Sequence, residues 1–179
     1  MTTFRHRLMG ASVLDVGTYE EVEADRSATT QAFLVVLASS LATGIGASGF
    51  MAPGRPIVTG IFVWSAIALL AWAAWALLVF EVGGRLLPEP QTRVDVGELM
   101  RTIGFSAAPG MLRVFGVMPQ VTLPVFVLTT LWMLVAMVVA VRQALDYSST
   151  ARAIGVCALG LALALGVVFV FGMMATPLS

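Results

Sequence analysis

The sequence predicts an all-α integral membrane protein, a bundle of five transmembrane helices. Of its 179 residues, 59% are hydrophobic and only 11% are charged, whereas a soluble domain is about 45–50% apolar and about 25% charged. The mean hydropathy is +0.94. Four uncharged runs are each long enough to form a helix across about 30 Å of hydrocarbon. These observations exclude an ordinary water-soluble fold.

A tight turn joins the first two runs. Residues 31–52 are followed by Pro53-Gly54-Arg55-Pro56, in which two prolines and a glycine cannot continue a helix. Residues 57–80 form the second run, which ends at Glu81 and Arg85. Because these two side chains are four residues apart, we expect them to pair at the water boundary.

The other two runs are residues 121–141 and residues 153–174. The connection between them contains Arg142 and Asp146, which are again four residues apart and are expected to lie one helical turn from each other at the water boundary. Three hydroxyl residues, 148–150, precede the last run and offer N-caps for its helix.

Residues 95–118, between the second and third runs, are apolar but interrupted by Arg101, Pro109-Gly110 and Arg113. Asp95 favours a helix start because an acidic side chain complements the helix dipole there. We interpret the segment as a fifth membrane span, short and broken near Pro109, because neighbouring helices can cover the backbone groups that a break leaves free. The alternative is four spans plus an interfacial helix.

All ten basic residues are arginine, and their positions favour five spans with a cytoplasmic N-terminus. In that topology eight arginines lie inside and only Arg55 and Arg113 lie outside, as the positive-inside rule expects. With four spans the ratio falls to seven against three. The eight are Arg5, Arg7, Arg26, Arg85, Arg93, Arg101, Arg142 and Arg152.

The polar N-terminus is predicted to be a cytoplasmic arm, residues 1–29, that precedes a helical transmembrane domain, residues 30–179. The short apolar stretch of the arm, residues 8–14, contains glycine and serine, and an acidic run follows it where a signal peptide would have its cleavage site. We therefore expect no cleaved signal peptide.

Small residues recur every four positions in three of the spans and predict where the helices pack, because close approach through small side chains drives helix association in lipid. We interpret these stripes as contacts within the chain, with contacts to another subunit as the alternative. The residues are Ser40, Gly44 and Ser48; Ala136, Ala140 and Ala144; and Ala158, Ala162 and Gly166.

The reactive side chains argue against an enzyme. The only histidine is His6 and the only cysteine is Cys157, so we expect no cofactor and no metal site. No phosphate-binding loop, zinc-protease motif or nucleophile elbow occurs in the sequence. The formal net charge of +0 provides no overall attraction to nucleic acid.

The charged residues next to the spans are predicted to lie near span ends, where snorkelling and pairing keep them in contact with water. A membrane-buried ionisable group would instead point to an ion path or a proton relay. We therefore assign these residues a structural role. They are Glu81, Arg85, Arg101, Arg113, Arg142, Asp146 and Arg152.

Several stretches occur in an order that resembles a known family. They are Tyr19-Glu20-Glu21-Val22-Glu23-Ala24-Asp25, then Thr43-Gly44-Ile45-Gly46-Ala47, Phe105-Ser106-Ala107-Ala108-Pro109-Gly110-Met111-Leu112, Trp132, and Val141-Arg142-Gln143-Ala144-Leu145. Together they resemble bacterial members of the Yip family, the Ypt/Rab-interacting membrane proteins. The resemblance implies five spans and a cytoplasmic N-terminus, in the bacterial cytoplasmic (inner) membrane. Eukaryotic relatives bind prenylated small GTPases.

We expect a non-enzymatic multi-pass membrane protein that acts by packing against partner proteins, a second copy of itself or membrane lipids. A more specific form is an accessory or structural subunit of a larger membrane complex. Five charged or polar positions on the inner side are the candidate interaction residues. They are Tyr19, Glu21 and Asp25 before the first span, and Arg142 and Arg152 around the last loop.

The alternative is a channel or transporter for a neutral or lipid-like solute. Such a protein needs a polar path through the bundle, which serine and threonine hydroxyls would line. Such hydroxyls more often bond to the backbone of their own helix, which favours the first hypothesis. The candidates are Ser39, Ser40, Thr43, Ser65, Thr129 and Thr130.

Overall fold

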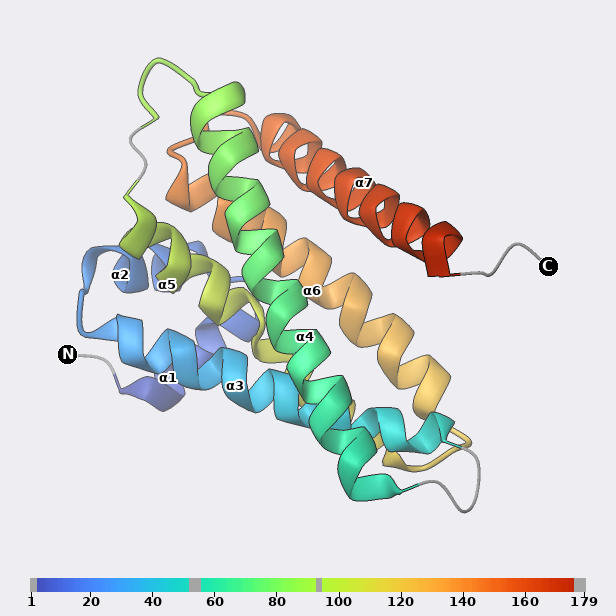
Figure 1. The fold of residues 1–179 in the computed structure, drawn as a ribbon. Helices are drawn as coiled ribbons and strands as arrows, with labels where there is room; N and C mark the ends of the chain where they lie inside the picture. Colours follow the sequence, from blue (N-terminus) through green and yellow to red (C-terminus); the bar gives the residue numbers. More distant parts are fainter. Residues whose placement is uncertain (1–2, 52–55, 93–94, 176–179) are drawn as a thin grey trace.

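The computed structural model describes residues 3–51, 56–92 and 95–175, with side chains as far as residue 163 (Figure 1). Every regular element in these ranges is a helix, which confirms the all-α class. In chain order the elements are α1 (Phe4–Ser12), α2 (Val16–Ala24), α3 (Ala28–Ala47), η1 (Ser48–Phe50), α4 (Ile57–Val79), η2 (Phe80–Leu86), α5 (Val96–Ser106), η3 (Ala108–Val117), α6 (Thr122–Ala144) and α7 (Thr150–Ala175). The element η2 is a π-helix, and η1 and η3 are 3-10 helices.

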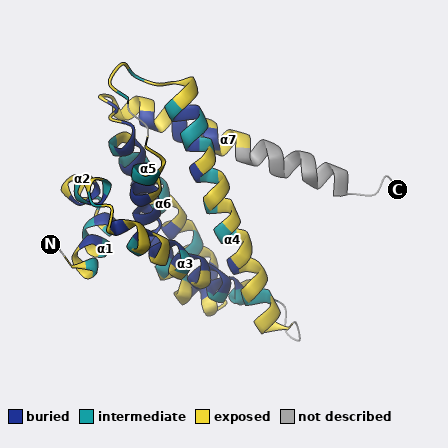
Figure 2. Ribbon diagram, turned by 60° about the vertical axis from the view of Figure 1, so that its left-hand side comes forward, coloured by how far each residue is buried: buried dark blue, intermediate teal, exposed yellow. Residues whose placement is uncertain are grey.

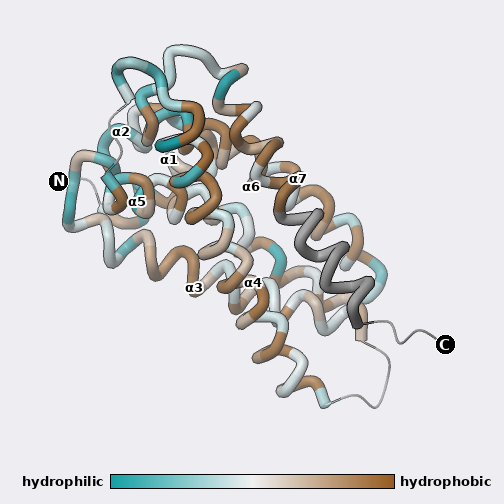
Figure 3. The backbone as a smooth tube through the Cα atoms, turned by 45° about the horizontal axis from the view of Figure 1, so that its top comes forward, coloured by the Kyte–Doolittle hydropathy of each residue, from teal (hydrophilic) through white to brown (hydrophobic). Residues whose placement is uncertain are grey.

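Three of these helices are long and apolar enough to cross a membrane: Ala28–Phe50, Ile57–Leu86 and Thr122–Ala144. The described side chains of α7 form a shorter apolar stretch, Thr150–Leu163. These helices coincide with the four uncharged runs of the sequence. Figure 3 shows hydrophobic residues along α4 and α6 and a concentration of hydrophilic residues at the end of the bundle with α1 and α2.

The helices alternate in direction between two ends of the bundle. We call the end with α2 and the start of α3 the arm-side end, and the end with η1 and the start of α4 the far end. α3 and the α5–η3 segment run from the arm-side end to the far end. α4 runs back, because Gly44 lies against Ser65 and the Trp72 Nε1 donates to the Ile103 carbonyl. α6 also runs back, from Thr122, which donates to the Gly116 carbonyl, to Arg142, which lines a pocket with α2.

The segment between the second and third runs is divided into two pieces that follow α3. The sequence predicted a break near Pro109, and in the structure α5 ends at Ser106 while Pro109 lies in the first turn of η3. Proline is tolerated there because its missing N–H needs no partner in the first turn of a helix. Asp95 caps α5 by accepting from the Gly97 and Glu98 amides, at 2.6 and 3.1 Å.

Close approaches along this segment show that it lies beside α3 over most of the length of that helix. A Cβ atom built on Gly104 would contact Ala32, and one built on Gly49 would contact the Gly116 carbonyl. A 3-10 helix rises about 2.0 Å per residue and an α-helix about 1.5 Å. The length along the helix axes is therefore about 23 Å from Gly104 to Gly116 and about 25 Å from Ala32 to Gly49, so the two segments extend over nearly the same distance.

The small residues of α3 and α6 lie where these helices contact their neighbours. Ser40 and Gly44 are buried, and Ser48 is half-buried and donates to the Ile45 carbonyl at 2.6 Å. The three α6 residues are fully buried between α6 and its neighbours. They are Ala136, Ala140 and Ala144.

The described residues of the α7 stripe do not face the bundle. Ala158 and Ala162 are exposed, and Gly166 lies outside the residues with described side chains. The face of α7 turned to the bundle instead carries Val156 and Cys157. Because successive helical residues are about 100° apart, a stripe that starts one residue after Cys157 lies away from the contact. Figure 2 shows that much of α4 is exposed as well, as expected of a lipid-facing helix.

Candidate functional site

Buried arginine–carboxylate bonds hold the N-terminal arm together. Arg7 is 3% exposed, and its Nε and Nη2 donate to Glu21 Oε1 at 2.9 and 2.8 Å. Its Nη2 also donates to Asp25 Oδ2 at 2.5 Å, and its Nη1 to Gln31 Oε1 at 3.2 Å. Glu21 and Asp25, two of the candidate interaction residues, therefore hold Arg7 of α1 against α2, and Gln31 joins Arg7 to the start of α3.

The hydrogen bond from Arg7, followed by those from Ser27, lowers the pKa of Asp25 from 3.8 to about 2. A carboxyl whose pKa is lower in the folded protein stabilises the fold above its ordinary pKa. This stabilisation is lost as the pH falls from about 3.8 to about 2, so the contact is complete at neutral pH.

A second buried arginine attaches the arm to the bundle. Arg101 of α5 is 5% exposed, and its Nε donates to the Val22 carbonyl at 2.9 Å. Its Nε and Nη2 also donate to the Glu23 carbonyl. These carbonyls lie in the last turn of α2, where no amide of the same helix can reach them and a cation is favourable. The prediction that Arg101 stays in contact with water is therefore wrong.

Two aromatic side chains bind the end of α1 in a similar way. Tyr19 is fully buried, and its hydroxyl donates to the Ala11 carbonyl at 3.2 Å. Trp132 of α6 donates from Nε1 to the Ser12 carbonyl at 2.8 Å. The arm thus lies against the flank of the bundle. Tyr19, which the sequence suggested as an interaction residue, has its ring inside the arm.

Two loops at the arm-side end are also bound to each other. The Tyr147 hydroxyl lies 2.8 Å from the Gly83 carbonyl and 2.9 Å from the Leu87 carbonyl, and donates to one of them at a time. Glu89 accepts from the amide and hydroxyl of Ser148, at 3.1 and 2.9 Å, which lowers its pKa. Arg152, another candidate residue, pairs with Glu89 at 3.4 Å.

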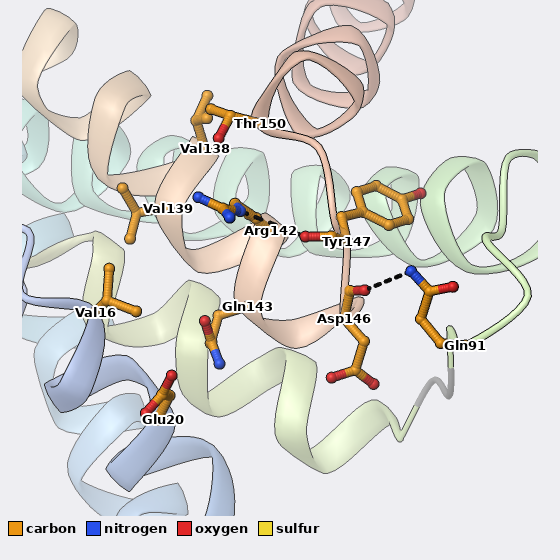
Figure 4. A pocket seen from close by; sticks show the side chains of 10 residues that line it. All are labelled: Val16, Glu20, Gln91, Val138, Val139, Arg142, Gln143, Asp146, Tyr147 and Thr150. Atoms are coloured by element: carbon orange, nitrogen blue, oxygen red, sulfur yellow. Dashed lines mark hydrogen bonds between the residues drawn. The ribbon is translucent and has the colours of Figure 1, made fainter.

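Between the arm and these loops lies a pocket of about 620 Å³, which we call the arm-side pocket (Figure 4). Its walls come from α2, α6, the loop before α5 and the start of α7. It is lined by Val16, Glu20, Gln91, Val138, Val139, Arg142, Gln143, Asp146, Tyr147 and Thr150. The pocket therefore brings the segment before the first span and the last loop together.

The Arg142 guanidinium lies in this pocket, and its Nε donates to the Tyr147 carbonyl at 3.4 Å. The expected placement of Arg142 and Asp146 one helical turn apart is wrong, because α6 ends at Ala144 and Asp146 has a left-handed φ of 51°. Figure 4 shows the Asp146 carboxylate turned away from Arg142. By contrast, Glu81 and Arg85 form the expected pair at 2.8 Å.

Glu23, at the end of α2, has a pKa raised from 4.5 to about 7, first by burial and then by the nearby Asp146 and Glu98, against the opposing effect of Arg101. Between pH 4.5 and 7 the folded protein binds more protons at this site than the unfolded chain. Stability therefore falls as the pH rises through this window.

We expect Glu23→Gln to raise the apparent melting temperature at pH 8 more than at pH 5, because glutamine cannot acquire the buried charge. Thermal unfolding of the purified protein in a mild detergent at both pH values measures this. Glu20→Gln, at an exposed position on the same helix, is the matched control and should change the melting temperature much less. A lower melting temperature of Glu23→Gln at pH 8 would contradict the expectation.

Arg113 is half-buried among threonine hydroxyls of α3 and α6 rather than at a span end, so that prediction is wrong as well. Its Nε, Nη1 and Nη2 donate to the hydroxyls of Thr129, Thr43 and Thr130, at 3.2, 3.3 and 2.8 Å. Thr43 and Thr129 in turn donate to the Ser39 and Val125 carbonyls of their own helices. Thr43, Thr129 and Thr130, which the sequence suggested as lining for a solute path, therefore surround Arg113. The sequence analysis placed this arginine on the outer side of the membrane.

A cavity of about 40 Å³ adjoins this hydroxyl cluster and includes Ser39 and Ser40 in its lining. That volume has room for one or two waters. The nearby Ser65 hydroxyl is buried without a hydrogen-bond partner among the described residues. A channel or transporter for a neutral solute stays a prediction.

The residues that hold the arm-side end together were mostly missed by the sequence reasoning. Arg7, Arg101 and Tyr147 were each visible as polar residues, but their partners lie 14 to 79 residues away along the chain. No local pattern identifies such partners. In the part of the chain that the structure describes, no group of three or more His, Cys, Asp or Glu is placed to hold a metal ion.

The comparison with protein families gives one match. The model of the Yip1 domain matches residues 16–171, which extend from the start of α2 into α7. The chain belongs to the Yip1 family. This confirms the resemblance found in the sequence, and Yip1 proteins are membrane-associated. The Yip1 match includes the whole lining of the arm-side pocket, whereas α1 lies outside it. Neither the curated proteins nor the solved structures gave a match.

Proposed function

We propose that this Yip1-family chain is a non-enzymatic membrane protein that binds a partner protein at its arm-side end. The observation that carries the proposal is the arm-side pocket, which α2 and the last loop enclose together. Buried hydrogen bonds hold both walls in place, so the surface is preorganised and little ordering entropy is lost on binding. An accessory or structural subunit of a larger membrane complex is the specific form of this role.

The pocket chemistry suits protein recognition better than catalysis. Glu20, Asp146 and Arg142 supply both signs of charge, and Val16 and Val139 supply apolar wall. No histidine, cysteine or lysine occurs among the ten lining residues, so the pocket lacks the commonest general base, histidine, and the most nucleophilic side chain, cysteine. Arginine is enriched at protein interfaces, and Arg142 projects from the middle of this surface.

The topology that we propose has five spans, a cytoplasmic N-terminus and an outer C-terminus. Its support is the α5–η3 segment, which follows α3 over nearly the same thickness. Arg85, Arg101, Arg142 and Arg152 belong to the arm-side end, whereas Arg113 lies towards the far end. Under the positive-inside rule this asymmetry makes the arm-side end cytoplasmic. The likeness to bacterial Yip sequences favours the bacterial cytoplasmic membrane.

Site-specific photo-crosslinking in intact cells tests the proposal. A photoreactive p-benzoylphenylalanine at Gln143, which lines the pocket, should give a discrete adduct with a cytoplasm-facing protein or with a second copy of the chain. The same adduct should weaken at least about tenfold in an Arg142→Glu background, because charge reversal opposes the original contact.

The matched control is the same photoreactive residue at Leu128, which is exposed on the same helix in the membrane layer. That position should react mainly with lipid. Protein adducts of equal strength from both positions, no protein adduct from Gln143, or adducts with proteins of the outer side would each refute the proposed site or its orientation.

A further inference from the structure

The Arg113 guanidinium carries a charge that the described protein does not neutralise. No carboxylate of the described residues lies within salt-bridge distance of it. A guanidinium has five N–H donors, and three of them point to threonine hydroxyls. The side chain also lies over the Phe126 ring, 5.2 Å from its centroid. Arg113 is therefore held in a fixed position, and two of its N–H donors have no hydrogen-bond partner among the described residues.

Beside Arg113 is a groove of about 400 Å³ between α3, α4 and α6, which we call the Arg113 groove. Phe50 and Met51 line it at the far end, and Thr43 and Ala68 line it deeper in the bundle. Most of its other lining residues are apolar, and Arg113 is the only charged residue that lines it in the part of the chain that the structure describes. The groove thus leads from the far end to the Arg113 guanidinium.

The Arg113 groove opens on the side of the bundle that faces lipid in the proposed topology. Phe50, Trp64 and Ile67, all of which line it, are 57%, 46% and 48% exposed. Thr43 is seven residues before Phe50, which places the guanidinium about 10 Å inside the far end. A charge at such depth is costly, and local thinning of the bilayer with entry of headgroups and water reduces the cost.

We propose that the Arg113 groove binds the headgroup of one glycerophospholipid, whose phosphate pairs with Arg113. The two spare N–H donors match phosphate oxygens, since arginine binds phosphate through paired hydrogen bonds. The exposed apolar side chains of α4 provide surface for the acyl chains. A free anion would pair with Arg113 but would make no contact with the apolar walls of the groove.

Native mass spectrometry of the full-length protein in a mild detergent tests the proposal. We expect one dioleoyl-phosphatidylglycerol to bind more tightly than dioleoylglycerol, which has the same chains and no phosphate. Arg113→Gln should weaken phosphatidylglycerol binding about 10- to 100-fold, the range for losing hydrogen bonds to a charged group. Arg85→Gln is the control, because Arg85 also lies over an aromatic ring but belongs to the arm-side end.

A second variant leaves Arg113 in place. Ala68→Phe fills the inner part of the groove and should weaken phosphatidylglycerol binding at least about tenfold, whereas Ala66→Phe, exposed on another side of the same helix, should not. Unchanged binding in Ala68→Phe, equal binding of dioleoylglycerol, or displacement of the lipid by inorganic phosphate would overturn the proposal. The outcome is independent of any partner at the arm-side end.

Discussion

Replacing Gly46 with alanine is expected to destabilise the protein by about 3 kcal/mol, the upper part of the usual range for overpacking. A Cβ atom on Gly46 would lie 1.9 Å from the carbonyl oxygen of Arg113 and 2.9 Å from its carbonyl carbon. Both atoms are backbone, so no side chain can rotate away. Helix α3 and η3 must separate, and thermal unfolding in a mild detergent should show a much lower melting temperature.

The control for this change is Gly155→Ala in α7, where a new Cβ would meet no atom within 4 Å. Alanine is preferred over glycine inside a helix by about 0.5–1 kcal/mol, so this variant should be as stable as the parent or slightly more stable. A Gly46→Ala protein that melts at the parent temperature would show that α3 and η3 are not in close contact.

The membrane helices could be predicted because their signal is local. An uncharged run of sufficient length is enough to locate a span, and α4 begins at the predicted residue, Ile57. Pro109 also acts locally, since it lacks the amide that a continued α-helix would use. The break between α5 and η3 therefore followed from the sequence within a few residues.

The path of η3 beside α3 could not be predicted in the same way. It depends on Gly46 and Gly49, which let backbones approach across two segments more than 50 residues apart, and on Gly110, which leaves room for the Ser39 side chain. The sequence showed these glycines without their partners. Likewise, the spacing of Ala158 and Ala162 suggested a packing face on α7, but only the position of the neighbouring helices determines which face is covered.

The candidate site was predicted in outline, and its internal bonds were not. The sequence placed Arg142 and the acidic arm on the same side of the membrane, and the structure brings Arg142 and Glu20 into one pocket. It did not show that Glu21 and Asp25 are already bound by Arg7. These carboxylates were selected for their charge, and charge alone does not distinguish a structural contact from a free binding group.

Arg101→Met is expected to release the arm from the bundle. The change removes the donors to the Val22 and Glu23 carbonyls and leaves these groups of α2 without their partners, at a cost of about 3 kcal/mol. Hydrogen exchange of residues 4–24 should become much faster, while exchange within α6 stays slow. The effect should be larger at pH 8 than at pH 5, because Arg101 is also the cation that opposes the raised pKa of Glu23.

Two variants separate this effect from a general loss of charge. Arg26→Met removes an exposed arginine next to α2 and should leave exchange in the arm unchanged. Arg101→Lys keeps the charge but has fewer donors in a less rigid arrangement, so it should give an intermediate rate. If Arg101→Met exchanges like the parent in residues 4–24, the arm is held by its other contacts, which include the bond from Trp132 to the Ser12 carbonyl and apolar packing. If α6 loses protection together with the arm, Arg101 stabilises the whole bundle, and α1 and α2 are not a separable unit.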